Sequence, residues 1–164
     1  MAVLDPIKPK VLAVRLIPNI ERGFAAQLKL RGDERSIGFL TVDIDDATYT
    51  AIDDATKKAN VRVAYAKSFY AGSRHASGPL SGEIIAILAG PTPAEVRAGL
   101  DAAIAYLEDQ AWFYAANEAG TIAFFPHLIS QTGSYLSQAA GVPRGTAMSY
   151  LIAPPLEATF GIDA

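Results

Sequence analysis

The chain contains a long internal repeat. Residues 46–49 (DATY) align with residues 157–160 (EATF), and the apolar run before each copy aligns without a gap, so that Leu40 falls on Leu151. The offset is constant at 111 residues, the distance from Asp46 to Glu157. A period of this length exceeds the roughly 20–50 residues of solenoid repeats and predicts a duplicated domain.

The repeat also sets the expected domain organisation. We expect residues 1–110 to form a first domain of mixed α/β (α+β) class, and residues 111–164 to form the N-terminal part of a second. In each domain a mostly antiparallel sheet would be flanked by helices. The second copy includes no counterparts of the first copy's later strands and helix, so it is incomplete. On domain size we expect the natural protein to continue for about 50 residues beyond Ala164.

Apolar patterning predicts the strands of the first domain. Alternating or continuous apolar runs of strand length occupy residues 10–18, 36–42, 61–70 and 83–88. In the second copy, residues 121–129 and 147–153 match the first two of these runs. The recurrence of the same order predicts that the second copy begins with the same strand, short helix and strand as the first.

Helix signals lie between these runs. Asn19 is placed to cap a short helix, and Asp45 or Asp46 is placed to cap the next, because a carboxylate there accepts backbone N–H bonds. In that second helix we expect four small or apolar residues to face inward: Ala51, Ile52, Ala55 and Ala59. Four charged residues are expected to face outward: Asp53, Asp54, Lys57 and Lys58.

The third helix has the clearest start signal in the chain. Thr92 is a suitable cap, Pro93 occupies the first helical position, and Glu95 stands where a capping box requires an acid. The apolar residues that follow share one helical face and are expected to be buried: Val96, Leu100, Ala103, Ile104 and Leu107.

Composition excludes several classes of function. The chain carries 14 basic and 17 acidic residues without a Lys/Arg cluster, which argues against a nucleic-acid partner. Zero cysteines exclude disulfides and thiolate metal sites. No run approaches the ~20 apolar residues of a membrane span. His75 and His127 are far apart in sequence, and no catalytic triad is recognisable. We therefore expect no metal, no cofactor, no catalytic residues and no enzymatic activity.

The acids at residues 45–46 suggest a binding function. Asp46 and Glu157 are equivalent in the repeat, so a two-fold-like packing of the copies would bring their carboxylates together. Several carboxylates around a narrow opening attract small cations and repel anions. The plainer interpretation is that Asp45 and Asp46 only cap a helix, and the two roles are compatible.

Several strings give the chain a specific resemblance. The helix sequence PTPAEVRAGLDAAIAYLE (91–108) and the order of elements resemble a bacterial microcompartment shell domain. Four further strings resemble the ethanolamine-utilisation shell proteins of the EutL type: VDIDDATY (42–49), KSFYAGSRH (67–75), TGSYLS (132–137) and APPLEATFGIDA (153–164). The resemblance runs from Leu4 to Ala164, which implies tandem, circularly permuted shell domains with the second one truncated.

The resemblance implies a function. Three chains would form a homotrimeric, pseudo-hexameric tile with a gated central pore for metabolite or cofactor transport. The tile would meet other shell proteins in the shell of a cytoplasmic microcompartment. A small acidic pore in each chain would bind ethanolamine, a cation at neutral pH. Carried over by position, the ligand-binding residues are Asp45, Asp46, Glu83, Phe113 and Glu157.

Other interpretations stay open at this point. Glu83 is also explained as a solvated strand end, and Phe113, with its aromatic neighbours, as core packing. The duplicated unit would also suit an amine sensor that forms no shell. The acids would also suit a general acid/base pair with a bound metal, although no histidine stands near them.

Overall fold

Two four-stranded sheets and four helices form the described part of the molecule. The computed structural model describes residues 2–70 and 82–154. The strand order is β2-β3-β5-β4 in the first sheet and β1-β6-β7-β8 in the second. The elements are β1 Pro6–Ile7, β2 Val11–Ile17, α1 Arg22–Gln27, β3 Ser36–Val42, α2 Asp45–Lys58, β4 Arg62–Phe69, β5 Glu83–Gly90, α3 Pro93–Asp109, β6 Phe113–Ala115, β7 Ala123–Ile129, α4 Ser134–Ala140 and β8 Met148–Ile152.

The first sheet is antiparallel and packs its inner face against α2 and α3. Strand β3 is central, with Leu40 opposite Val14 of β2 on one side and Ala86 of β5 on the other. Leu40 and Ile84 are fully buried in the main core, which also contains apolar residues of both helices. The predicted strands at 10–18, 36–42, 61–70 and 83–88 are confirmed. A second, smaller cluster buries Ile37 and Ile87 on the other face, so the central strands β3 and β5 are largely covered on both sides.

Helix α3 begins with the predicted Thr92 cap and Pro93, but the Glu95 carboxylate does not take its predicted capping-box role. Thr92 Oγ1 accepts a hydrogen bond from the backbone N–H of Glu95 at 3.2 Å, with Pro93 in the first turn. The Glu95 carboxylate accepts from the backbone N–H of Asn60 at 2.8 Å. Glu95 thereby joins the start of α3 to the loop before β4. Of the five predicted apolar contacts of this helix, Ile104 is the one left partly exposed.

Three predictions about helix ends and faces are wrong. Glu21, not Asn19, caps α1, where its carboxylate accepts from the N–H groups of residues 23 and 24. Ile44 occupies the cap position of α2 without a side-chain bond, so Asp45 and Asp46 lie inside the first turn. Asp53 and Asp54 are buried, and the second repeat covers α2 at Asp53, whose carboxylate accepts from the N–H groups of residues 133 and 136.

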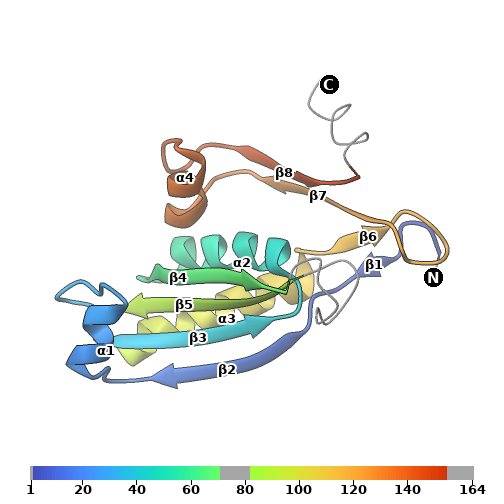
Figure 1. Ribbon diagram of the computed structural model, residues 1–164. Coiled ribbons are helices and arrows are strands. Elements are labelled where there is room, and N and C mark those ends of the chain that lie inside the picture. The colour runs from blue at the N-terminus through green and yellow to red at the C-terminus, as the bar shows by residue number, and fades with distance from the viewer. Residues whose placement is uncertain (1, 71–81, 155–164) are drawn as a thin grey trace.

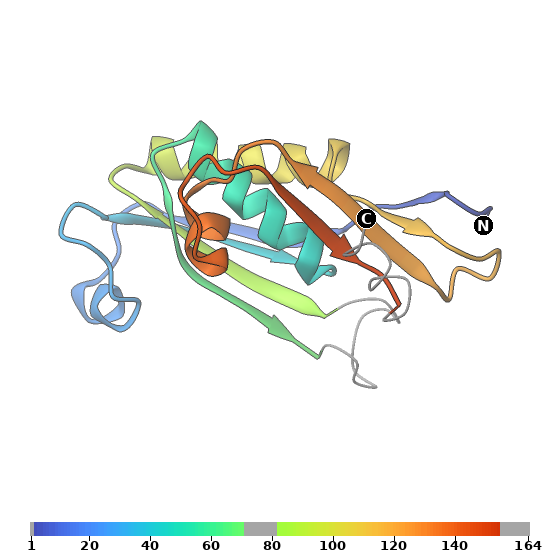
Figure 2. The ribbon, with the colours of Figure 1, turned by 90° about the horizontal axis from the view of Figure 1, so that it is seen from above.

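The second repeat reproduces the first in three dimensions. Its elements β7, α4 and β8 correspond to β2, α1 and β3, and β7 pairs antiparallel with β8. The register differs by one residue: Phe39 lies opposite Arg15, whereas its equivalent Tyr150 lies opposite His127. Both views of the ribbon show these elements lying over α2, on the side away from the first sheet (Figures 1 and 2).

The N-terminal strand crosses the domain boundary predicted at residue 110. Strand β1 pairs with β6, with Ile7 opposite Phe113, and so belongs to the second sheet. Among the described helices, none combines the length and the apolar character needed to cross a bilayer.

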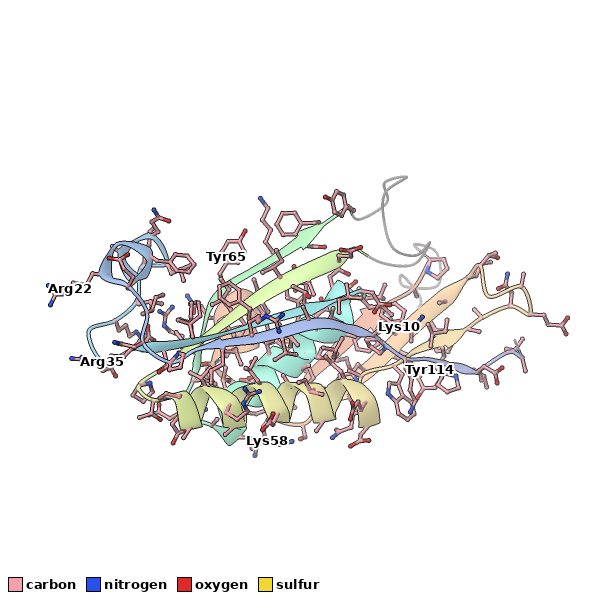
Figure 3. The ribbon with its side chains drawn as sticks, turned by 90° about the horizontal axis from the view of Figure 1, so that it is seen from below. Lys10, Arg22, Arg35, Lys58, Tyr65 and Tyr114 are labelled. Atoms are coloured by element: carbon pink, nitrogen blue, oxygen red, sulfur yellow. The ribbon has the colours of Figure 1, made fainter. Side chains whose placement is uncertain are left out.

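Basic side chains lie at both ends of the first sheet. Lys10 lies at the start of β2, whereas Arg22 and Arg35 lie around α1 at the other end (Figure 3). Since β2 and β3 are antiparallel, the start of β2 is also where β3 ends and α2 begins. The two arginines are therefore remote from Asp45 and Asp46.

Candidate functional site

The candidate site is the corner where β3 turns into α2. We call Asp45, Asp46, Ser68 and Tyr150 the acidic corner. Asp45 and Asp46 belong to the first turn of α2, Ser68 lies near the end of β4, and Tyr150 lies on β8 of the second repeat. Both carboxyl side chains are half-buried. The corner is thus assembled from both copies of the repeat.

Hydroxyl groups from two strands orient the two carboxylates. Asp45 Oδ1 accepts from the backbone N–H of Asp46 at 2.9 Å, and Asp45 Oδ2 accepts from the hydroxyl of Ser68. Asp46 Oδ1 accepts from the Tyr150 hydroxyl at 2.8 Å. Hydrogen bonds to a charged acceptor are stronger than neutral ones and fix its position.

The electrostatics of the corner favour a cation. Burial raises the pKa of Asp46, the hydrogen bond from Tyr150 opposes that rise, and the neighbouring Asp45 charge adds to it. Burial and then the two carboxylates raise the pKa of Tyr49, one turn further along α2. Both shifts have the same origin, namely negative charge held in a partly desolvated place. A cation bound there would relieve that charge.

Tyrosine side chains of the second repeat lie beside the N-terminal half of α2. Tyr49 stacks on Tyr135 of α4 with 6.0 Å between ring centroids. Burial raises the pKa of Tyr135 to about 12, and burial, followed by the Asp46 charge, raises the pKa of Tyr150 further. These phenols therefore stay protonated and act as hydrogen-bond donors at neutral pH.

The predicted site residues are placed as follows. Asp45 and Asp46 lie side by side in the acidic corner. Glu83 begins β5 opposite Phe69, whereas Ser68 lies opposite Ile84. Because side chains alternate along a strand, Glu83 is at the same end of the sheet as Asp45 but on the opposite face.

The other two predicted residues lie elsewhere. The Phe113 side chain is 3% exposed and stacks on Phe125 with 4.9 Å between ring centroids, so Phe113 packs between β6 and β7. Glu157 lies outside the described residues.

Sequence reasoning missed Ser68 and Tyr150. Ser68 carries no motif beyond its place near the end of an alternating strand. Tyr150 had one signal: the repeat aligns it with Phe39, and β3 and β8 precede the equivalent acids. That alignment placed Tyr150 on a strand near the acids of its own repeat. It did not predict that Tyr150 contacts Asp46 of the first repeat.

A second set of contacts fixes the second repeat on α2. The Asp53 carboxylate accepts from the N–H groups of Gly133 at 2.7 Å and Leu136 at 2.8 Å. Thr56 Oγ1 accepts from the N–H of Ser134 at 2.9 Å. A Cβ atom on Gly133 would lie 2.3 Å from Thr56 Oγ1, so this close approach requires glycine. These contacts explain why Asp53 is buried.

A histidine–tyrosine pair forms a third contact between the repeats. Tyr106 of α3 and His127 of β7 are joined by a hydrogen bond of 2.5 Å, and the His127 ring stacks on Phe125. Burial and the nearby Lys57 charge lower the pKa of His127. His127 therefore packs within the interface as a neutral ring. Across residues 2–70 and 82–154, no cluster of three or more potential metal ligands is found.

Comparison with known proteins gives consistent matches. The BMC domain matches residues 36–117. The chain is 54% identical over 164 residues to the bacterial microcompartment shell protein EutL of Salmonella typhimurium, covering 100% of this chain and 75% of that protein.

Solved structures agree with the sequence match. The ethanolamine utilization protein EutL from Leptotrichia buccalis superposes with a TM-score of 0.90 at 56% identity, over 99% of this chain and 75% of that one. EutL from Clostridium perfringens gives a TM-score of 0.90 at 48% identity, over 99% and 74%.

Proposed function

The chain belongs to the BMC-domain family of bacterial microcompartment shell proteins, and we propose that it is the shell protein of an ethanolamine-utilisation microcompartment. Members of this family are structural proteins rather than enzymes, and they reside in the microcompartment shell within the cytoplasm. The observation that carries the proposal is the 54% identity to a EutL protein along all 164 residues. That match disfavours a duplicated amine sensor outside a shell.

We propose that three copies assemble into a pseudo-hexameric tile with a gated central pore, which meets other shell proteins at its edges. The duplicated architecture supports a three-fold tile, because each chain supplies two similar units. Exposed apolar side chains on both sheets would be available for lateral contacts, with Leu128 79% exposed and Leu12 50% exposed.

We propose further that the acidic corner binds ethanolamine. The ammonium group would donate hydrogen bonds to the carboxylates of Asp45 and Asp46, which already lie side by side in a partly desolvated corner. The resemblance also implies Glu83, Phe113 and Glu157. Glu83 lies on the opposite face of the sheet and Phe113 is buried against Phe125, so Asp45 and Asp46 are the residues proposed to hold the ammonium group.

Calorimetry tests the binding proposal. Ethanolamine is titrated into the chain and into the variants Asp45→Asn and Asp46→Asn, with Asp101→Asn on the exposed side of α3 as a matched control. Each corner variant should lose about tenfold or more in affinity, equivalent to about 1.4 kcal/mol, while the control binds like the parent. Equal affinity in all four proteins would reject the site.

Sedimentation and electron microscopy test the assembly. Trimers or extended sheets would support the tile. A monomer that binds an amine without assembling would favour the sensor, and turnover of an amine would favour an enzyme.

A further inference from the structure

Tyr150 of the second repeat contacts the acidic corner. Tyr150 and Asp46 are 104 residues apart in sequence, and the Tyr150 hydroxyl donates to Asp46 Oδ1 at 2.8 Å. Further along α2, Asp53 holds the loop before α4. Tyr49, Thr56 and Lys57 of α2 also contact the second repeat. Within the described residues, only the contact through Tyr150 ends on a carboxylate of the candidate site.

The contact determines which form of Asp46 is favoured. Burial and the adjacent Asp45 charge both favour the protonated, neutral carboxyl, whereas a hydroxyl donor favours the carboxylate. The groups that face Asp46 are Asp45 and Tyr49 on α2 and Tyr150 on β8, and Ser68 on β4 bonds to Asp45. Among these groups, Tyr150 is the one that donates to Asp46 from another element.

A neutral Asp46 would be a poor partner for an ammonium group. It would lose its attraction for the cation, and its O–H would be a donor facing another donor. Keeping Asp46 charged is therefore a requirement for amine binding in this corner, and that requirement is met from the second repeat.

We propose that Tyr150 is a positioning residue that holds Asp46 in its ionised form, and that amine binding in the acidic corner is thereby coupled to docking of the second repeat on α2. The amine part rests on the proposed function, whereas the effect of Tyr150 on Asp46 does not. Coupling is reciprocal, so a bound cation would also strengthen the docking of β8 on α2.

The variant Tyr150→Phe tests the effect on Asp46 directly. It removes one hydroxyl and keeps the ring, so the packing of β8 is preserved. Tyr135→Phe is the matched control, because Tyr135 also belongs to the second repeat and stacks at the same end of α2. Carbon-13 NMR titration of the Asp46 carboxyl should show its midpoint rising by about one pH unit in Tyr150→Phe and unchanged in Tyr135→Phe. An identical midpoint in Tyr150→Phe and the parent would overturn the inference.

Calorimetry with ethanolamine tests the coupling. At a pH above both midpoints found for Asp46 in the NMR titration, Tyr150→Phe should bind within about threefold of the parent. At a pH below both midpoints, the variant should lose up to about tenfold more affinity than the parent does. Parallel pH profiles would overturn the coupling while leaving the binding site intact. Absence of ethanolamine binding by the parent would instead reject the proposed function, and the NMR titration would still decide the role of Tyr150.

Discussion

Replacing Asp53 should release the second repeat from α2. The Asp53 side chain is 1% exposed and its two oxygens accept from two backbone N–H groups, at 2.7 Å from Gly133 and 2.8 Å from Leu136. A hydrogen bond to a charged group contributes about 1.5–3 kcal/mol, and a buried N–H left without an acceptor costs about as much.

These contributions set the expected loss in the free energy of unfolding. Asp53→Ala removes both acceptors and should lower the free energy of unfolding by about 3–5 kcal/mol. Asp53→Asn keeps one carbonyl oxygen but turns an amide N–H₂ toward a backbone N–H, so about 2–3 kcal/mol should be lost. The helix propensities of Asp and Asn are similar, so the loss reflects the contact between the repeats.

The adjacent Asp54 provides a matched control. Asp54 forms ion pairs with Lys57 at 3.2 Å and Lys58 at 2.7 Å, and the Lys58 side chain is 52% exposed. Asp54 is buried, but its lysine partners can turn to solvent and no backbone N–H loses its acceptor, so Asp54→Asn should cost less than Asp53→Asn.

Urea unfolding and amide hydrogen exchange measure the effect. In Asp53→Asn the amides of Gly133 and Leu136 should exchange much faster, while amides in the first sheet keep most of their protection. The reasoning is refuted if Asp53→Asn and Asp54→Asn have the same unfolding midpoint, or if exchange at Gly133 is unchanged.

Three further predictions concern stability. Gly133→Ala should destabilise the fold by about 1–3 kcal/mol through overpacking, whereas Gly32→Ala, which has no atom within 4 Å of the added Cβ, should be neutral in thermal unfolding. Thr92→Ala should cost about 1 kcal/mol by removing the cap of α3, and an unchanged melting temperature would contradict this. Burial tends to raise the pKa of Glu34, but the Arg62 guanidinium, at 2.6 Å, lowers it overall. Stability from this pair is therefore present above the ordinary carboxyl pKa and is lost as pH falls through the lowered value. In Arg62→Met this acid-side loss should disappear from urea unfolding measured between pH 3 and 6.

Local signals accounted for most of the fold predicted from sequence. The strand at 36–42 follows from its short apolar run, and the start of α3 follows from Thr92 and Pro93, whose conformational preferences act over a few residues. The recurrence of strand, short helix and strand in the second copy followed from the repeat. The sequence-based prediction was wrong for the face of α2 that carries Asp53. A charged residue was expected to face solvent, but Asp53 is buried because its hydrogen-bond partners come from the other repeat.

The site residues were likewise predictable only where local sequence decides their position. Asp45 and Asp46 could be selected from sequence, because two adjacent acids after a strand end up at one corner whatever surrounds them. The face on which Glu83 lies depends on strand register, and the burial of Phe113 depends on the stacking of Phe125. Neither property is encoded locally.

The sequence alone determined the duplication, the order of strands and helices, and the pair of acids after the second strand, since each depends on neighbours along the chain. The tertiary structure alone decided that β8 lies over α2, so that the hydroxyl of Tyr150 meets Asp46 across 104 residues. The physical reason is that a hydrogen bond requires two groups within about 3 Å, and packing of the two repeats sets that distance.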